Sequence, residues 1–362
     1  MSFKIGPRLV GQGQPCFITY EAGPTHDGLQ TARKLVQAAA DAGADAVKFQ
    51  VLDPERLVAD KKQLFTYEYL VDRASGATRE KSEPLYDILK RRSLSRQEWK
   101  ELKAFSDSLG LAFFATVSFE PDVDLLAELG CDSIKIASGD VNHFPLIRYA
   151  ARTGISLQLD TGNSTIGEIE AAVDLIREAG NERIIIHHCP SGYPARRDGI
   201  NLRVIQTLRS MFPYPIAFSD HTPGWDMDIA AICLGAHMVE KTITLDRTTP
   251  SVEHIMSLED EDIGRFVTVI RDLEAAFGNP RRIMHEAEIK KRDLVRRSVF
   301  VARDMAAGQQ VTAADLDYRR PGTGIAPSEC ARVLGRSLAV AKRAGEMLRY
   351  DDLAAPASSA RS

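Results

Sequence analysis

The sequence lacks the features that mark membrane, secreted and nucleic-acid-binding proteins. No apolar run approaches the roughly 20 residues that a helix needs to cross a bilayer. The first residues, MSFKIGPRLVGQGQPCF, show neither the apolar core nor the cleavage pattern of a secretory signal. Lysine and arginine (46) do not outnumber aspartate and glutamate (50), and the net charge of −4 argues against a basic nucleic-acid-binding face. We therefore expect a cytoplasmic protein whose partners include neither a membrane nor a nucleic acid.

Cysteine is scarce, and its spacing is not that of a disulfide scaffold. The five cysteines are odd in number, scattered along the chain, and never spaced as C-x-x-C. We interpret them as small buried hydrophobic residues of a protein in a reducing compartment. The sequence also has no G-x-G-x-x-G after its first predicted strand, the motif with which many open α/β sheets bind dinucleotides.

Short β-branched or aromatic segments alternate with helical patterns along most of the chain. The segments are too continuously apolar for half-exposed antiparallel strands and are typical of parallel strands covered by helices. We predict a (β/α)₈ TIM barrel, and rank an open doubly wound sheet lower because the dinucleotide motif is missing. The eight predicted strands are residues 17–23, 46–50, 111–117, 133–138, 155–161, 184–189, 215–220 and 238–243.

The alternation predicts the domain organisation. We expect a barrel domain over residues 1–280, a linker over 281–294, a small turn-rich domain over 295–354 and a disordered tail over 355–362. One connection, residues 51–94, is too long for a simple turn, and we expect it to cover a site or contact a partner subunit.

Polar residues gather where the predicted strands end. In a TIM barrel the carboxyl ends of the strands carry the active site, and polar groups at eight consecutive strand ends fit poorly with a purely structural role. These residues are Glu21, Lys48, Gln50, Thr116, Lys135, Ser138, Asp160, Thr161, His188, Ser219, Asp220, His221, Glu240 and Thr242.

Two lysines in this set lie within apolar runs. A lysine buried in such a run needs an anionic partner or a depressed pKa. If Lys48 and Lys135 face one cavity, they form a receptor for a phosphate or a carboxylate, assisted by hydroxyl donors from nearby strand ends. The alternatives are a Schiff-base nucleophile and an ion pair with a neighbouring carboxylate. His221 is a candidate metal ligand or general acid.

With these residues assembled, the sequence resembles the sialic acid synthase family, which condenses phosphoenolpyruvate with N-acetylmannosamine or related sugars. The segment RPGTGI (320–325) is similar to the antifreeze-like (SAF) domain that these enzymes carry. The resemblance implies a TIM barrel followed by that small domain. The matching barrel segments are EAGPTHDG (21–28), VKFQ (47–50), VDLLAELGCDSIKIASGD (123–140), TGNSTIGEI (161–169), HCPSGYP (188–194), FSDHTPG (218–224), LGAHMVEKTITLDR (234–247) and EHIMSLE (253–259).

The resemblance also implies roles for single residues. Glu21 is expected to move a proton at the acceptor-sugar site, and His221 to hold a divalent cation, manganese or magnesium. An arginine of the small domain, Arg320, is expected to complete the sugar site of a partner subunit, which implies a domain-swapped homodimer. The positions implied for phosphoenolpyruvate are Lys48, Thr116, Lys135, Ser138, Ser191 and Ser219, and those for the sugar are Glu21, Gln50, Tyr193, Glu253 and Arg320.

The sequence departs from the family pattern near the reaction centre. Thr242 replaces the second metal-binding histidine, and a hydroxyl is a poor ligand for a divalent cation compared with imidazole. Glu240 can substitute only if its carboxylate reaches the cation. Asp160 replaces a serine near the phosphate, where a carboxylate repels the ligand unless it is protonated, paired with a lysine or turned away; Thr161 offers the missing hydroxyl.

These departures indicate a divergent branch that uses another sugar, such as a precursor of legionaminic or pseudaminic acid, for surface polysaccharides. Two alternatives stay open: a pyruvate aldolase with Lys48 or Lys135 as Schiff-base former, and a sugar- or phosphoenolpyruvate-binding protein that has lost turnover.

Overall fold

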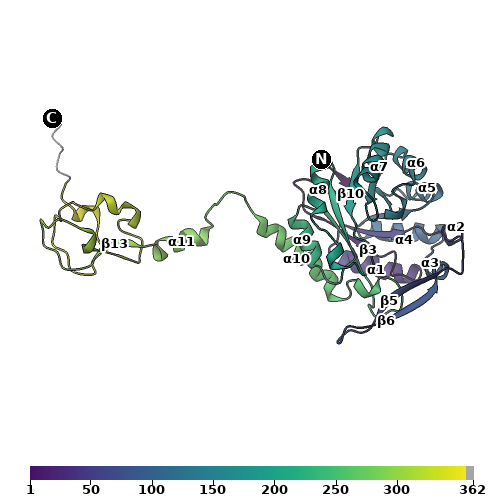
Figure 1. Ribbon diagram of the computed structural model, residues 1–362, viewed down its shortest axis with the longest axis horizontal. Helices are drawn as coiled ribbons and strands as arrows, with labels where there is room; N and C mark the ends of the chain where they lie inside the picture. Colours follow the sequence, from purple (N-terminus) through teal and green to yellow (C-terminus); the bar gives the residue numbers. More distant parts are fainter. Residues whose placement is uncertain (356–362) are drawn as a thin grey trace. The chain divides into compact units, whose positions relative to one another are not determined.

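The structure is a computed structural model that describes residues 1–355. The chain divides into two compact units, Met1–Gly278 and the part that begins at Asn279 (Figure 1). The predicted tail, residues 355–362, lies outside the described residues except for Ala355.

Eight parallel strands form the centre of the first unit and close into a barrel. The last strand pairs with the first, so the TIM barrel is confirmed and the open sheet is excluded. Each predicted strand matches a barrel strand to within two residues. The strands are β3 (Phe17–Glu21), β4 (Ala46–Gln50), β7 (Ala112–Val117), β8 (Ser133–Ile136), β9 (Ser156–Asp160), β10 (Ile184–His188), β11 (Ile216–Asp220) and β12 (Met238–Thr242).

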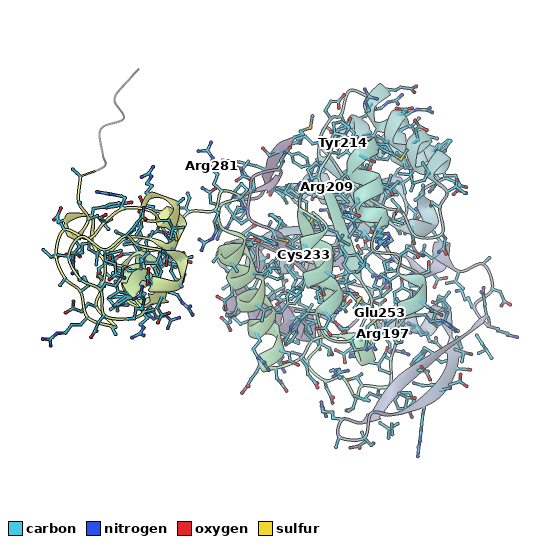
Figure 2. All side chains as sticks on the ribbon, turned by 60° about the vertical axis from the view of Figure 1, so that its left-hand side comes forward. Arg197, Arg209, Tyr214, Cys233, Glu253 and Arg281 are labelled. Carbon is cyan, nitrogen blue, oxygen red and sulfur yellow. The ribbon has the colours of Figure 1, made fainter. Side chains whose placement is uncertain are left out.

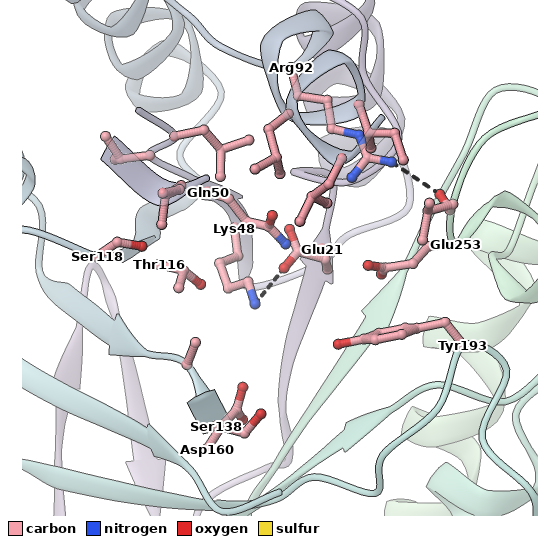
Figure 3. Close-up of a pocket in the computed structure, with 18 of the residues that line it drawn as sticks. Glu21, Lys48, Gln50, Arg92, Thr116, Ser118, Ser138, Asp160, Tyr193 and Glu253 are labelled. Atoms are coloured by element: carbon pink, nitrogen blue, oxygen red, sulfur yellow. Dashed lines mark hydrogen bonds and ion pairs between the residues drawn. The ribbon is translucent and has the colours of Figure 1, made fainter. Parts of the chain in front are cut away.

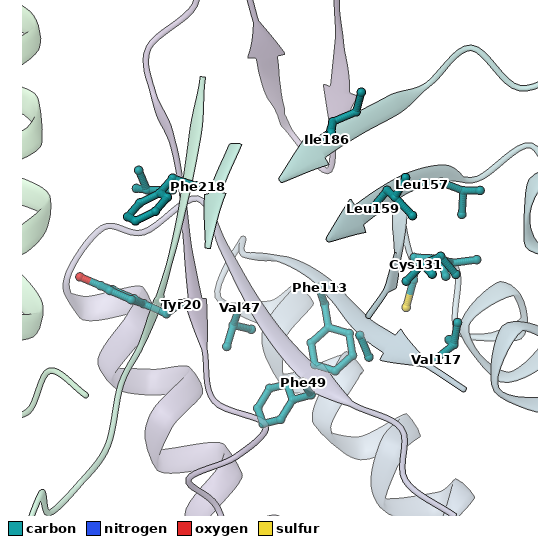
Figure 4. Packing of buried hydrophobic residues seen from close by; sticks show 14 of the residues in the cluster. Tyr20, Val47, Phe49, Phe113, Val117, Cys131, Leu157, Leu159, Ile186 and Phe218 are labelled. Atoms are coloured by element: carbon teal, nitrogen blue, oxygen red, sulfur yellow. The ribbon is translucent and has the colours of Figure 1, made fainter. Parts of the chain in front are cut away.

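Helices cover the outside of the barrel and bury the outward-facing strand residues. Phe49 and Phe113 stack with ring centroids 5.5 Å apart, and Trp99 packs edge-on against both rings (Figure 4). A capping box begins α4 (Arg96–Ser108), because the Ser95 hydroxyl accepts the Glu98 N–H and the Glu98 carboxylate accepts the Ser95 N–H. The covering helices are α1 (Leu29–Asp41), α4 (Arg96–Ser108), α5 (Glu120–Glu128), α6 (Phe144–Arg152), α7 (Ile166–Glu178), α8 (Val204–Met211), α9 (Asp226–Cys233) and α10 (Glu261–Phe277).

The barrel interior is apolar at one end and polar at the other. An N-terminal hairpin, β1 (Ser2–Ile5) and β2 (Arg8–Gly11), was not predicted. Its residues Ile5 and Val10 pack into a buried cluster with inward side chains of the strands. This cluster fills the amino-terminal end of the barrel, so the polar inward residues lie toward the carboxyl ends of the strands.

The long connection after β4 folds into a helix, a hairpin and a second helix. Its elements are α2 (Pro54–Leu57), β5 (Leu64–Asp72), β6 (Ala77–Pro84) and α3 (Leu85–Arg91). The Tyr67 hydroxyl lies 2.6 Å from the Glu83 carboxylate and 2.7 Å from the carbonyl of Pro250, and its single proton is shared between these two acceptors. The hairpin is therefore tied to the connection that follows β12.

The second unit has a small core of its own. Its elements include α11 (Glu286–Val295), the antiparallel strands β13 (Ser298–Val301) and β14 (Leu316–Arg319), and short 3₁₀ turns at Ala313–Asp315, Pro327–Arg332 and Tyr350–Asp352. Ten apolar side chains, among them Val299, Val311 and Leu348, form its buried cluster.

Two general features of the chain follow from the described residues. Across residues 1–355, the apolar stretches of the helices are too short to cross a membrane. All five cysteines are free; Cys16, Cys131 and Cys189 are buried, whereas Cys233 on α9 is exposed (Figure 2).

Candidate active site

The structure brings the two predicted lysines together at one carboxylate. Lys48 Nζ lies 2.6 Å from Glu240 Oε1, and Lys135 Nζ lies 2.6 Å and 2.7 Å from the two oxygens of the same group. All three side chains are buried. The two ammonium groups are thus close enough to share a single anionic partner.

The strand register explains why these groups meet. Glu21 of β3 lies opposite Lys48 of β4, and Ser219 of β11 lies opposite Glu240 of β12. Alternate residues of a strand point to the same side, so these side chains all face the barrel interior. Lys48 also forms an ion pair with Glu21.

The ion pairs set the charge of each group. Burial alone would lower the pKa of Lys48, but the carboxylates of Glu21 and Glu240 outweigh burial and raise that pKa well above its ordinary value. Burial alone would raise the pKa of Glu240, but Lys135 and Lys48 hold it well below its ordinary value. The pKa of Glu21 is raised by burial, against the opposing effect of Lys48. Glu21 is therefore the carboxylate of this cluster that takes up a proton most readily.

Asp160 is paired rather than isolated. Its Oδ1 lies 3.1 Å from Lys135 Nζ and 3.0 Å from the Ser219 hydroxyl. Pairing with a lysine is one of the three conditions under which an aspartate at this position is compatible with a bound phosphate. His187 lies against Ser219 at 2.9 Å, and burial lowers the pKa of His187 to about 3, so its imidazole is neutral.

A cavity of about 400 Å³ opens above this cluster, with polar and apolar sides (Figure 3). The polar side holds most of the predicted site residues, and the apolar side comes mainly from the long connection after β4. The polar lining includes Glu21, Lys48, Gln50, Thr116, Ser138, Asp160, Tyr193, His221, Glu240 and Glu253. The apolar lining includes Leu57, Val58, Phe65, Leu85, Ile88, Leu89 and Val252.

Glu253, Tyr193 and His221 lie on the loops around the cavity. Burial raises the pKa of Glu253 to about 7, even though Arg92 opposes the shift. The backbone of Glu253 has a φ of 74°, a left-handed conformation that is uncommon for a residue other than glycine. The His221 ring lies 4.6 Å from the Tyr193 ring, and its Nδ1 is 3.0 Å from the carbonyl of Pro190.

The side chains present do not fit a divalent-cation site built on two imidazoles. His221 offers one nitrogen, because its Nδ1 is used by a backbone carbonyl. The Glu240 carboxylate is occupied by two ammonium groups and is not free to replace the missing histidine, and Thr242 contributes only a neutral hydroxyl. In the described part of the chain, no three His, Cys, Asp or Glu side chains are grouped to hold a metal.

Eight of the residues singled out in the sequence do not line this cavity. Three of them are Lys135, Ser219 and Thr242, although Lys135 and Ser219 belong to the ion-pair cluster. Thr161 and Ser191 line a neighbouring depression, where their hydroxyls donate to the carbonyl of His187 and to Asn163. Their role with phosphoenolpyruvate stays a prediction, as does the role of Arg320, which belongs to the second unit. The remaining two residues outside the cavity lining are His188 and Asp220.

Two of the polar strand-end residues point away from the barrel interior. His188 and Asp220 each follow an inward-facing residue, so their side chains point outward. His188 contacts the carbonyl of Ile200 at 2.6 Å, and Asp220 pairs with the buried Lys241. His187 occupies the inward position on β10 instead.

One buried charged residue of the cavity, Arg92, was not predicted from the sequence. Arg92 follows α3 and is only 5% exposed. In the sequence it ends the run Lys90-Arg91-Arg92, which has the composition of a solvated surface. The only available signal was that Ile88 and Arg92 are four residues apart and so share one face of a helix.

Comparison with known proteins identifies the family. The model of the NeuB family matches residues 35–282, and the model of the SAF domain matches residues 296–354. The chain belongs to the NeuB family. Residues 296–354 are accordingly its SAF domain, as the resemblance of RPGTGI implied.

Relatives of this NeuB-family chain cover nearly its whole length. It is 36% identical to N,N'-diacetyllegionaminic acid synthase of Legionella pneumophila, over 97% of this chain and 98% of the relative. It is 30% identical to N-acetylneuraminate-9-phosphate synthase of Mus musculus, over 84% of this chain and 83% of the relative. A solved sialic acid synthetase of Leptospira borgpetersenii in complex with citrate superposes with a TM-score of 0.69 at 29% identity, covering 80% of this chain and 95% of that structure.

Proposed function

We propose that this enzyme condenses phosphoenolpyruvate with an N-acylated amino sugar to give a nonulosonic acid and phosphate. The observation that carries the proposal is the convergence of Lys48 and Lys135 on a single carboxylate, Glu240, which lines the cavity. Two ammonium groups that both contact one carboxylate are close enough to bind a small ligand with a phosphate and a carboxylate. The relatives, which are synthases of sialic-type acids, supply the reaction class.

The residues around the lysines suit the individual steps. The lysines and the hydroxyls of Thr116 and Ser138 would hold the anionic groups of phosphoenolpyruvate. C3 of the enolpyruvate attacks the aldehyde carbon of the open-chain sugar, and a carbon–carbon bond forms while the aldehyde oxygen takes a proton. Water then adds to the cationic C2, and the C–O bond to phosphate breaks. Glu21, with its raised pKa, is placed to transfer a proton.

We propose a legionaminic-type acceptor. Two relatives that are N,N'-diacetyllegionaminic acid synthases, from Legionella pneumophila and Campylobacter jejuni, are 36% and 31% identical to this chain. The acceptor for such a product is a six-carbon diacetamido sugar, because phosphoenolpyruvate adds three carbons. The apolar side of the cavity is suited to acyl methyl groups and deoxy positions. We propose that the enzyme acts in the cytoplasm and makes a precursor of surface polysaccharides.

The side chains of this site do not match the two-histidine cation site that the resemblance implies. The donor set offers one imidazole, so we propose that turnover depends on added Mn²⁺ or Mg²⁺ less than in relatives with two histidines. None of the steps above is assigned to a metal.

Two other functions are less well supported. A Schiff-base aldolase needs a neutral lysine, whereas Lys48 is held as an ammonium by two carboxylates. A binding protein without turnover would need no group that donates a proton to the aldehyde oxygen. Glu21 and Glu253, near the lysines, both have raised pKa values, as a carboxyl group that donates a proton requires.

The test measures phosphate release from phosphoenolpyruvate with a panel of acetamido sugars, with and without Mn²⁺. We expect release that requires both substrates. Silence across the panel would favour the binding protein, and covalent trapping of pyruvate by borohydride would favour the aldolase.

A further inference from the structure

Arg92 is a buried cation without a carboxylate partner. Among residues 1–355, four lysine or arginine side chains are buried. Three of them, Lys48, Lys135 and Lys241, have a carboxylate oxygen within 4 Å. For Arg92 the nearest carboxylates lie farther away than that, although Glu253 and Glu21 are close enough to affect its charge.

Within residues 1–355, few protein acceptors bind the Arg92 guanidinium. Its two hydrogen bonds both come from Nη2 and are long, 3.3 Å to the Ser251 hydroxyl and 3.4 Å to the carbonyl of Val252. A guanidinium has five N–H donors, and in the described part of the chain Nε and Nη1 have no protein acceptor, which leaves them available to a ligand in the cavity. Burial of such a group is unfavourable, as the lowered pKa of Arg92 reflects. A group kept at this cost beside a cavity is a candidate for ligand recognition.

The surroundings of Arg92 indicate the kind of ligand. Arg92 lines the cavity beside apolar side chains of α3, Ile88 and Leu89, and beside Val252. A donor next to an apolar surface matches an acylamino group, whose carbonyl oxygen accepts a hydrogen bond and whose methyl group packs against carbon. An anionic substituent suits the position less well, because Glu253 and Glu21 already supply negative charge nearby.

The position of Arg92 indicates which end of the sugar it contacts. In Figure 3, Arg92 lies on the side of the cavity opposite Ser138 and Asp160, with Lys48 and Glu21 between them. The aldehyde carbon must lie near the lysines, where phosphoenolpyruvate is held. A group that reaches Arg92 is therefore at the remote end of the acceptor.

We propose that Arg92 is a specificity residue that donates hydrogen bonds to an acylamino group at the end of the acceptor remote from the aldehyde. This inference rests on the proposed function. Arg92 would then distinguish a diacetamido sugar from a sugar such as N-acetylmannosamine, whose single acetamido group lies beside the aldehyde.

The test compares the two sugars as substrates of wild type and of Arg92→Met, which keeps the side-chain length and removes the donors. We expect kcat/KM for 2,4-diacetamido-2,4,6-trideoxymannose to fall roughly 10- to 100-fold, the usual effect of losing a hydrogen bond to a charged group. The kcat/KM for N-acetylmannosamine and the KM for phosphoenolpyruvate should change less than about 3-fold. Arg92→Lys, which keeps the charge without the planar fork, should recover the preference only in part.

Two controls separate recognition from a structural role. Arg91→Met removes the neighbouring guanidinium, which is bound to Glu83 at 2.8 Å and 3.0 Å, and should leave the ratio of the two sugars unchanged. The melting temperature of Arg92→Met should equal or exceed that of wild type, because an unpaired buried charge is removed.

Three results would overturn the inference: equal losses with both sugars, a rise confined to the KM of phosphoenolpyruvate, or a marked drop in melting temperature. If wild type turns over neither sugar, the proposed function fails instead. In that case, isothermal titration calorimetry compares the affinities of the two sugars for wild type and for Arg92→Met.

Discussion

At the scale of single residues, Glu240 holds two ammonium groups in place before any substrate arrives. Replacing Glu240 with Gln leaves Lys48 and Lys135 without their shared partner, and we expect a loss of about 3 kcal/mol or more in stability. Phosphoenolpyruvate should supply the missing negative charge and raise the melting temperature of the variant more than that of wild type. An equal shift in both proteins, measured by thermal denaturation at several ligand concentrations, would argue against binding at the lysines.

Glu253 should give stability a specific pH dependence. Its pKa is raised by burial from 4.5 to about 7, so the folded state favours the neutral carboxyl. That contribution is present below pH 4.5 and is lost as the pH rises through about 7. Glu253→Gln should therefore gain stability relative to wild type between pH 5 and pH 8, by roughly 1–3 kcal/mol from the size of the shift.

Glu259→Gln is the matched control for this pH effect. A hydrogen bond from Arg73 lowers the pKa of Glu259, so loss of that carboxylate should cost stability at pH 8 rather than gain it. Thermal denaturation at pH 5 and pH 8 checks both variants. The same sign for both would show that the raised pKa of Glu253 is wrong.

The sequence predicted inward residues only where strand parity was clear. Lys48, Lys135 and Glu240 lie at alternating positions of apolar strands, so their direction follows from the pleat. His188 and Asp220 were grouped with these residues as polar strand ends, but a position at a strand end does not determine which side of the sheet a residue faces. Arg92 was missed because its burial depends on a connection that packs back over the barrel, which no local pattern encodes.

At the scale of elements, the connection between β4 and α4 supplies most of the apolar lining of the cavity. Its position beside a site could be predicted from its length, but the hairpin β5–β6 could not, because residues 64–84 are rich in charge and alternate poorly. The N-terminal hairpin was missed for a similar reason, since two four-residue strands carry little periodic signal. The eight barrel strands were predicted because each is continuously apolar and separated by a helix.

The hairpin should affect sugar binding through Tyr67. Tyr67→Phe removes the hydroxyl that contacts Glu83 within the hairpin and ties the hairpin to the carbonyl of Pro250, close in sequence to Glu253. We expect the KM of the sugar to rise roughly 2- to 10-fold, as for the loss of one or two ordinary hydrogen bonds. The KM of phosphoenolpyruvate should stay near that of wild type.

Tyr69→Phe provides the control, because Tyr69 packs against the same cluster but its hydroxyl makes no hydrogen bond within the described residues. Steady-state kinetics on both variants decide the matter. Equal changes in the two would mean that the hairpin acts by packing alone.

At the scale of the whole molecule, the SAF domain is expected to contribute Arg320 to a partner's sugar site. Arg320→Ala should raise the KM of the sugar about 10-fold or more and leave the KM of phosphoenolpyruvate almost unchanged. Arg319→Ala removes an adjacent guanidinium that pairs with Asp317 and serves as the control.

Light scattering should show a dimer for the wild type and for both variants. A monomer with full activity, or equal effects of Arg320→Ala on the two substrates, would contradict the domain-swapped arrangement.

The most direct measurement of the proposed reaction follows the bridging oxygen of phosphoenolpyruvate. The enzyme is given phosphoenolpyruvate labelled with ¹⁸O between carbon and phosphorus, together with the diacetamido sugar, and both products are analysed by mass spectrometry. We predict a nine-carbon acid without the label and phosphate that carries it, because the C–O bond breaks. Label in the sugar acid, or phosphate release that does not require the sugar, would contradict the condensation proposed here.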